Sequence, residues 1–245
     1  MIRNTLSHTK ECTFAIIAPD PKLENFPRPY GTGFFISSDG YFLTALHVIK
    51  EVNTKKISIR KPEFGGINTS YVKLIQKWPD FDIALLKVDF GETKKTEDQL
   101  KNKNGFDFLE IDFSVQKEGT PVYSFGYPLP KIEIHKVGGS SFGFHYFAPR
   151  ATSLIISSHY DILGLMVGKD KFPKFYVIDK ALNYGNSGGP IVLQESGKVI
   201  SVCVRFQPVE IPQRNGVKIK IPSLYGITSS LKNIEEELKN ILKFR

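Results

Sequence analysis

The sequence predicts an all-β protein, a sandwich or barrel of many short strands followed by one helix. Short runs rich in Val, Ile, Phe and Tyr recur between turn residues from Thr13 to Arg205. Strands at such even spacing are typical of β-sandwiches and barrels, whereas α/β folds alternate strands with helices. Clear helical periodicity is confined to the last segment of the chain.

The expected strands follow one another along the chain, with polar or Gly-rich turns between them. They span 13–18, 33–36, 41–44, 56–60, 83–88, 121–125, 152–157, 175–178, 189–193 and 199–205. Gly and polar residues predict loops at 99–105 and 136–143. The polar segment 112–119 is the expected connection between two halves of the molecule.

The end of the chain carries apolar residues at helical spacing. They are Leu231, Ile234, Leu238, Ile241 and Leu242. We expect a helix that begins after an N-cap at Ser229 or Ser230. The acid-rich middle of this helix, 235–237, and its position favour packing on the barrel over a membrane or partner surface.

Length and composition fit a soluble globular protein. A chain of 245 residues, 41% hydrophobic and 24% charged, holds one large domain or two small ones that share a core. Residues 1–8 lack a long apolar segment and no run approaches about 18 apolar residues, which predicts a cytoplasmic protein without membrane contact. Cys12 and Cys203 are expected to be reduced, buried thiols.

The charge balance is basic, with 33 Lys and Arg against 25 Asp and Glu, a formal +8. Such a balance attracts nucleic acid or acidic partners, but the lysines are dispersed and form no basic helix with interleaved aromatics. We therefore expect a solvated surface and no nucleic-acid partner. The histidines at 8, 135, 145 and 159 lack neighbours at metal-ligand spacing, so no metal or other cofactor is expected.

The hexapeptide Gly-Asn-Ser-Gly-Gly-Pro at 185–190 places the hydroxyl of Ser187 in a tight turn. Glycines adopt backbone conformations closed to other residues and let a substrate carbonyl approach. The N–H groups of Gly185 and Ser187 can then converge on a developing oxyanion. Taken alone, the same string also fits a hairpin without chemistry.

Two further segments carry a histidine and an acid next to apolar strands. The run 41–46 leads into His47, and Asp82 opens the strand at 83–88. A lone histidine after a strand is usually structural, but a carboxylate entering a core needs a partner. We expect Asp82, rather than Asp80, to be buried with an oxygen within hydrogen-bond reach of His47 Nδ1.

Together the three segments predict catalysis. Serine is a nucleophile at neutral pH only with a base to take its proton and a third group to orient that base. His47, Asp82 and Ser187 supply these groups in that chain order. The joint occurrence favours catalysis over three separate structural roles.

These residues give the chain a resemblance to the trypsin-like peptidases of the chymotrypsin fold, and within them to the HtrA/Deg-type branch. The matching segments are 31–36 with 43–48, 82–88, 125–128 and 179–190. The resemblance implies two antiparallel six-stranded β-barrels in one peptidase domain spanning 1–245. His47 and Asp82 then belong to a barrel at 13–112, Ser187 to a barrel at 119–228, and the helix to 229–245, with the triad in the cleft between the barrels.

The sequence departs from this family at several positions. Asn186 replaces the Asp with which digestive members bind a new N-terminus, so activation by trimming is not expected. HtrA-type proteins usually carry a PDZ module after the protease domain, and we expect none here, because the chain ends soon after Thr228. Tyr184 stands where many relatives have Pro or Arg, and 130–174 is unusually long and aromatic.

The resemblance also implies a substrate pocket. Its expected residues are Ala181, Leu182, Tyr184, Val204, Arg205 and Phe206. Ala181 replaces the acid of trypsins, so we expect a medium aliphatic side chain at the residue before the scissile bond. Arg205 turned inward would instead favour an acidic one. Asp179 is expected to be a structural hydrogen-bond acceptor.

An aromatic cluster in the long segment fits either a substrate groove or a core. It comprises Phe142, Phe144, His145, Tyr146 and Phe147. The leading function is a serine endopeptidase acting on a protein or peptide, with a regulatory partner protein. The alternatives are a peptide-binding pseudoprotease of the same fold, and an esterase or acyltransferase, against which the chain order and the β-rich pattern argue.

Overall fold

The computed structural model describes residues 2–23, 26–50, 52–60, 72–88, 105–137, 140–146, 148–160, 173–212 and 218–243. Its strands are β1 Thr13–Pro19, β2 Pro27–Phe35, β3 Tyr41–Ala45, β4 Ser58–Arg60, β5 Val72–Trp78, β6 Ile83–Val88, β7 Pro121–Gly126, β8 Lys131–Val137, β9 Ser140–Tyr146, β10 Arg150–Tyr160, β11 Phe175–Ile178, β12 Pro190–Leu193, β13 Val199–Pro212 and β14 Lys218–Ser230. Its helices are α1 Ile2–Cys12, α2 Leu46–Ile49 and α4 Glu235–Leu242, with 3-10 turns at Pro21–Leu23, Thr54–Lys56, Pro79–Phe81 and Leu231–Ile234.

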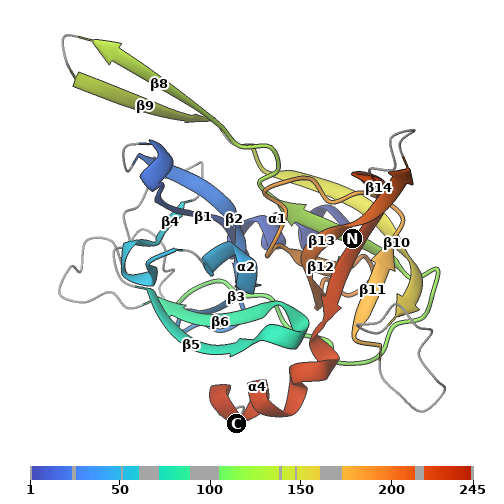
Figure 1. The fold of residues 1–245 in the computed structure, drawn as a ribbon. Coiled ribbons are helices and arrows are strands. Elements are labelled where there is room, and N and C mark those ends of the chain that lie inside the picture. Colours follow the sequence, from blue (N-terminus) through green and yellow to red (C-terminus); the bar gives the residue numbers. More distant parts are fainter. Residues whose placement is uncertain are drawn as a thin grey trace.

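The first half of the chain forms an antiparallel sheet, here called the N-terminal sheet. Within the described ranges it has six strands in the order β4-β1-β2-β3-β6-β5 (Figure 1). Ala45 lies opposite Ile83 at the end of the β3–β6 pair. His47 follows β3 and Asp82 precedes β6, so this register brings the two side chains together.

The second half forms a closed barrel, here called the C-terminal barrel. In the part of the chain that the structure describes, it has six strands in the order β10-β11-β14-β13-β12-β7. The predicted all-β fold with a C-terminal helix is confirmed. The barrel is closed, whereas β4 and β5 end the described strand order of the sheet.

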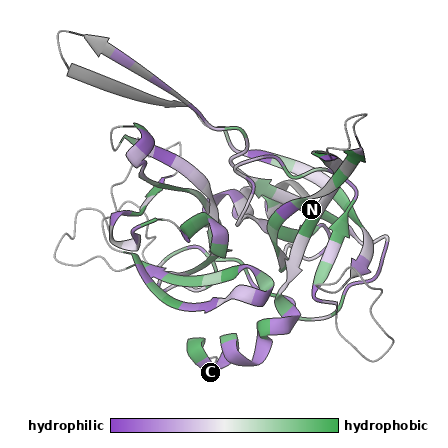
Figure 2. Cartoon of the chain, in the orientation of Figure 1, coloured by the Kyte–Doolittle hydropathy of each residue, from purple (hydrophilic) through white to green (hydrophobic). Residues whose placement is uncertain are grey.

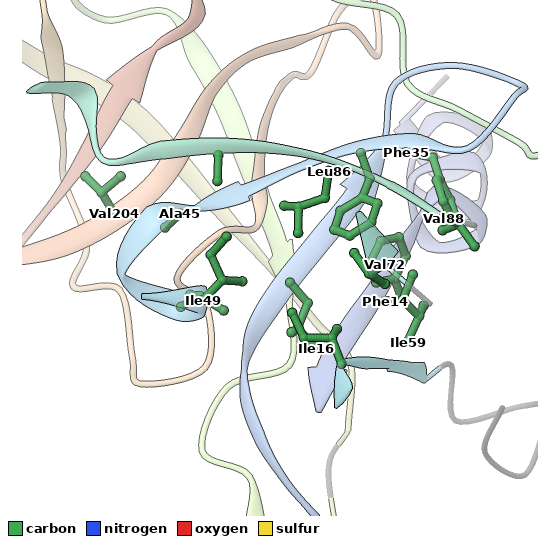
Figure 3. Close-up of a cluster of buried hydrophobic side chains, with 14 of the residues drawn as sticks. Phe14, Ile16, Phe35, Ala45, Ile49, Ile59, Val72, Leu86, Val88 and Val204 are labelled. Atoms are coloured by element: carbon green, nitrogen blue, oxygen red, sulfur yellow. The ribbon is translucent and has the colours of Figure 1, made fainter. Parts of the chain in front are cut away.

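The core is shared between the two halves. Phe14, Phe35 and Ile49 of the sheet half belong to one buried cluster with Phe175 and Val204 of the barrel (Figure 3). Figure 2 shows hydrophobic residues interspersed with hydrophilic ones along the strands of both units. This apolar contact holds the sheet and the barrel at a fixed distance, which a site between them requires.

Several elements differ from the sequence-based expectation. The segment 136–143 was expected to be a loop, but β8 and β9 pair as an antiparallel hairpin that projects from the body of the molecule (Figure 1). α1, β5 and β14 were not predicted. Of the loop expected at 99–105, residues 99–104 lie outside the described residues.

The C-terminal segment packs on the body as expected. Leu231, Ile234 and Leu238 are buried in a cluster that contains residues of both units. Ser230 is the N-cap residue, as expected, but its side chain makes no capping bond with the 3-10 turn that opens the segment. Its hydroxyl faces Tyr176 instead, with the two oxygens 3.5 Å apart.

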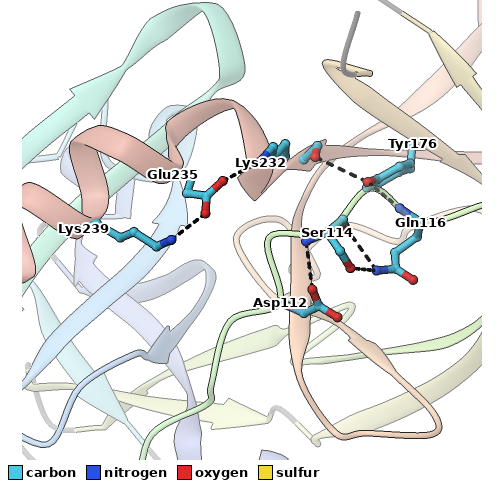
Figure 4. Close-up of polar contacts among 8 residues, drawn as sticks. Asp112, Ser114, Gln116, Tyr176, Lys232, Glu235 and Lys239 are labelled. Atoms are coloured by element: carbon cyan, nitrogen blue, oxygen red, sulfur yellow. Dashed lines mark hydrogen bonds and ion pairs between the residues drawn. The ribbon is translucent and has the colours of Figure 1, made fainter. Parts of the chain in front are cut away.

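Charged contacts hold this segment and the connection before the barrel (Figure 4). Glu235 pairs with Lys232 and Lys239, and the hydrogen bonds from these two lysines lower the pKa of Glu235. In the connection, Ser114 N–H donates to Asp112 Oδ1 at 2.8 Å. None of the helices in the described ranges has the length and apolar character needed to span a lipid bilayer.

Replacing Leu238 with alanine is expected to lower the free energy of unfolding by about 3 kcal/mol, because the side chain is fully buried between α4 and the sheet. Urea unfolding followed by the single tryptophan measures it, since Trp78 Nε1 donates to Glu237 Oε2 at 2.8 Å and so reports on α4. The matched control is Leu224→Ala, at a side chain that is 79% exposed, with an expected change of less than about 0.5 kcal/mol. Equal effects of the two substitutions would contradict the packing described here.

Candidate active site

His47 and Asp82 form a hydrogen-bonded pair. The imidazole Nδ1 lies 2.6 Å from Asp82 Oδ2, and the backbone N–H of His47 donates to Asp82 Oδ1 at 2.9 Å. The N–H of Leu46 also donates to the backbone oxygen of Asp82, at 2.9 Å. The aspartate thus fixes both the ring and the backbone of the histidine, and it selects the tautomer that carries a proton on Nδ1.

The acid in this contact is Asp82 and not Asp80, as the apolar strand after it predicts. Its expected burial is wrong, because the Asp82 side chain is 33% exposed and that of His47 is 44% exposed. Asp82 has a positive φ of 52°, at the end of the turn Pro79–Phe81. That turn leaves the pair partly exposed rather than in the core.

The turn that carries Ser187 depends on two glycines. Gly185 and Gly188 have φ values of 97° and 84°, in the region that L side chains rarely adopt. A Cβ on Gly188 would lie 2.2 Å from both Thr32 O and Thr44 Oγ1. Within the described residues, neither Gly185 N–H nor Ser187 N–H donates to another backbone carbonyl, so both remain available to a ligand.

Thr32 of β2 joins this turn to the N-terminal sheet. Its N–H donates to Ser187 O at 2.8 Å, and its hydroxyl donates to Gly185 O at 2.7 Å. The same hydroxyl accepts from Tyr127 N at 3.2 Å, and Thr32 O accepts from the Thr44 hydroxyl at 2.7 Å. A fully buried threonine therefore fixes the position of the turn relative to His47.

A cavity of about 150 Å³ brings the histidine and the serine together, here called the Ser187 cavity. Its lining is Arg28, Tyr30, His47, Val48, Val52, Tyr184, Gly185 and Ser187. Among the described residues no hydrogen bond joins His47 to Ser187. Such bonds are often long in enzymes without substrate and tighten when substrate binds.

The expected substrate-pocket residues do not gather in one cavity. Tyr184 lines the Ser187 cavity, but Leu182 lies in the interior of the C-terminal barrel and packs against Gly226. Val204 is buried between the barrel and the sheet. Leu182 and Val204 therefore contribute to the hydrophobic core and not to a substrate pocket.

The other three residues of the expected pocket are more accessible. Ala181 is half-buried, and Phe206 is 41% exposed. The Arg205 guanidinium lies over the Phe175 ring, 5.7 Å from its centroid, in cavities that also contain Asp82. The expected preference for an aliphatic residue before the scissile bond therefore stays a prediction, because these residues do not form one pocket.

Other expectations concern residues around the nucleophile. Asp179 Oδ1 accepts from Ile155 N at 2.9 Å, so this acid is a structural acceptor, as predicted. Cys12 and Cys203 are buried thiols, also as predicted, and burial raises the pKa of Cys203. Asn186 is buried directly beside the nucleophile.

The predicted aromatic cluster falls in and after β9. Phe142, Phe144, His145 and Tyr146 lie on that strand, whereas Phe147 lies outside the described residues. Their role stays a prediction. Within the same ranges, no group of three or more His, Cys, Asp or Glu side chains is arranged to hold a metal ion.

Sequence reasoning missed Thr32, Arg28 and Tyr30. Arg28 pairs with Asp20 at 2.9 Å, and its Nη2 donates to the Tyr184 hydroxyl at 3.3 Å. Thr32 stands between Gly31 and Gly33, in the segment 31–36 that carries part of the family resemblance. Its position between two glycines is the one signal that pointed to it, because such spacing indicates a close backbone approach.

Comparison with known proteins places these features in a family. The model of the trypsin-like peptidase domain matches residues 31–202. A probable periplasmic serine endoprotease, DegP-like, from Bartonella henselae is 31% identical over 177 residues, which are 72% of this chain and 28% of that protein. A protein of the same name from Pseudomonas putida is 32% identical over 174 residues, which are 70% of this chain and 28% of that protein.

Solved structures share the fold. The HtrA-type protease AlgW with decapeptide has a TM-score of 0.64 at 20% identity. The match covers 100% of this chain and 68% of the AlgW chain. The active form of the Rv3671c protease from M. tuberculosis has a TM-score of 0.60 at 19% identity, with 97% and 83% covered.

The curated relatives correct one expectation. They are named as periplasmic proteins, so the prediction of a cytoplasmic location is wrong. The chain spans 28% of the length of these relatives. With the family model matching most of its length, the chain belongs to the trypsin-like peptidase domain family.

Proposed function

We propose that this chain is a serine endopeptidase that cleaves peptide bonds through an acyl-enzyme on Ser187. His47 is the general base, Asp82 orients it, and the N–H groups of Gly185 and Ser187 bind the oxyanion. The observation that carries this proposal is the hydrogen bond of His47 to Asp82 beside a cavity that His47 shares with Ser187.

The proposed chemistry follows from the donors and acceptors of these residues. Ser187 Oγ attacks the substrate carbonyl while its proton passes to His47 Nε2, and the Asp82 carboxylate stabilises the imidazolium. When the tetrahedral intermediate collapses, the C–N bond breaks and the amine leaves with that proton. Water then attacks the ester by the same route, releasing the acid and restoring the serine.

The substrate class is supported by the relatives. AlgW has been solved with a tripeptide and with a decapeptide, and the curated relatives are named endoproteases. We carry a peptide or protein substrate over to this chain on that basis, together with the periplasm as its compartment. A regulatory partner protein remains a prediction.

A fluorophosphonate probe tests the nucleophile directly. The serine oxygen displaces fluoride from phosphorus only when a base removes its proton, so we expect one label per chain, on Ser187, located by peptide mass spectrometry. Ser187→Ala should abolish the label, and Ser196→Ala, at an exposed serine between β12 and β13, should retain it. An unlabelled wild-type protein would instead favour the peptide-binding pseudoprotease.

A further inference from the structure

A larger cavity adjoins the same histidine. It has a volume of about 590 Å³ and shares His47 and Val52 with the Ser187 cavity. A neighbouring cavity of about 300 Å³ has Asp82 and Arg205 in common with it. We call these two connected cavities the cationic groove. Their volumes fall in the range of ligand-binding sites.

Three cations line the cationic groove. Lys50 follows α2 as its C-cap residue, Lys77 belongs to β5 and Arg205 to β13, and all three are exposed. Among the residues that the structure describes, none of the three pairs with a carboxylate. The chain order separates these cations widely, so the dispersed lysines of the sequence concealed a local excess of positive charge.

The two acids of the cationic groove offset only part of this charge. Asp80 and Asp82 carry two negative charges against the three positive ones, so the groove keeps a net charge of +1. Arg205 is held over the ring of Phe175, a contact that positions a guanidinium without neutralising it. A groove with net positive charge attracts anionic side chains.

The walls of the larger cavity indicate the kind of anion. Leu46, Ile49 and Leu74 contribute apolar surface between the cations. Such surface suits the methylene groups of a glutamate, whereas single-stranded nucleic acid needs aromatic platforms for its bases. Among the described residues, Phe175 is the one Phe, Tyr or Trp that lines the cationic groove, and Arg205 lies over its ring. A single covered ring offers no series of platforms for successive bases.

We propose that the cationic groove binds acidic side chains of the peptide substrate, through Lys50, Lys77 and Arg205. This inference rests on the proposed endopeptidase function and specifies its substrate class. Arg205 then acts beside the His47–Asp82 pair and not in a pocket under the scissile bond. The acidic residues of the substrate lie away from that bond, and the Ser187 cavity is free to receive a neutral residue.

Binding can be measured without turnover in the Ser187→Ala protein. The probes are a fluorescein-labelled peptide with three glutamates on each side of a central valine, and its glutamine counterpart. By fluorescence anisotropy, we expect the glutamate peptide to bind about tenfold more tightly at low salt, as expected for three surface ion pairs. Ionic screening should reduce that ratio to about threefold or less at about 0.3 M NaCl.

Charge-matched variants assign the effect to the cationic groove. Combining Lys50→Gln, Lys77→Gln and Arg205→Gln should bring the ratio of the affinities for the glutamate and glutamine peptides close to one. Combining Lys22→Gln, Lys117→Gln and Lys218→Gln removes the same charge from exposed lysines outside the groove and should preserve it. If the groove variant does not fold, the three single substitutions are measured instead, and each should lower the ratio about twofold because each removes one ion pair.

Several outcomes would overturn the inference. The first is equal binding of the two peptides. The second is an equal loss of the preference for the glutamate peptide in both triple variants. The third is an oligonucleotide that binds more tightly than the glutamate peptide. The endopeptidase proposal fails separately. Selective binding of the glutamate peptide without fluorophosphonate labelling of the wild type would leave the cationic groove in place and remove the catalytic assignment.

Discussion

Replacing Ser187 with alanine is expected to lower kcat/KM by about 10⁴- to 10⁶-fold, because in the proposed mechanism its Oγ forms the acyl-enzyme. The fold should persist. Within the described residues, the hydrogen bond that Ser187 makes uses its backbone oxygen, which accepts from Thr32 N. The melting temperature should therefore stay unchanged while turnover is lost.

Initial rates on a reduced and alkylated protein substrate measure this loss. Ser196→Ala, which removes an exposed hydroxyl between β12 and β13, is the control and should retain the wild-type rate. Residual cleavage above about one hundredth of the wild-type rate would show that another group is the nucleophile. A large fall in melting temperature would show that the hydroxyl has a structural role.

Replacing Asp82 with asparagine is expected to lower kcat by about 10⁴-fold through the tautomer of His47. The two oxygens of Asp82 have different tasks, since Oδ1 accepts the His47 backbone N–H and Oδ2 accepts the ring N–H. An asparagine keeps its one oxygen toward the backbone N–H and turns its amide N–H₂ toward Nδ1. The ring proton then moves to Nε2, which can no longer accept the proton of Ser187.

Asp80→Asn is the matched control for this substitution. Asp80 is an exposed acid two residues away, so its replacement should change kcat less than about twofold. Asparagine also tolerates the positive φ at 82, which keeps the turn intact. A loss of activity in Asp80→Asn with normal activity in Asp82→Asn would transfer the orienting role to Asp80.

The sequence was sufficient to predict the strands with clear apolar runs. Phe175–Ile178 and Ile83–Val88 were found at their observed bounds, because these strands are almost wholly buried. β5 escaped because its residues alternate between buried and exposed without a regular period. β14 contains Pro222, a residue that counts against a strand, although its register with β13 accommodates it opposite Pro208.

α1 was missed for a different reason. Its sequence is polar, and its attachment depends on side chains that carry no periodic signal, such as Thr9, whose hydroxyl lies 2.8 Å from that of Tyr123. Contacts of this kind arise between residues far apart in the chain, so local patterns do not reveal them.

The candidate site shows the same difference between local sequence signals and long-range contacts. The local motifs identified His47, Asp82 and Ser187, because glycine turns and strand ends are properties of neighbouring residues. The walls of the substrate pocket depend on which way Leu182 and Val204 point, and packing of the whole barrel decides this. The three cations of the cationic groove belong to separate elements, so only the folded chain brings them together.

Three of the four hydrogen bonds of Thr32 join the two halves, so the nucleophile turn is sensitive to the spacing between them. A relative shift of about 1 Å carries such bonds beyond hydrogen-bond range. Ser187 and the proposed oxyanion donors would then lose their alignment with His47 while both halves stay folded. The alignment of Ser187 with His47 therefore depends on how the two halves are held together, and not only on the residues next to them.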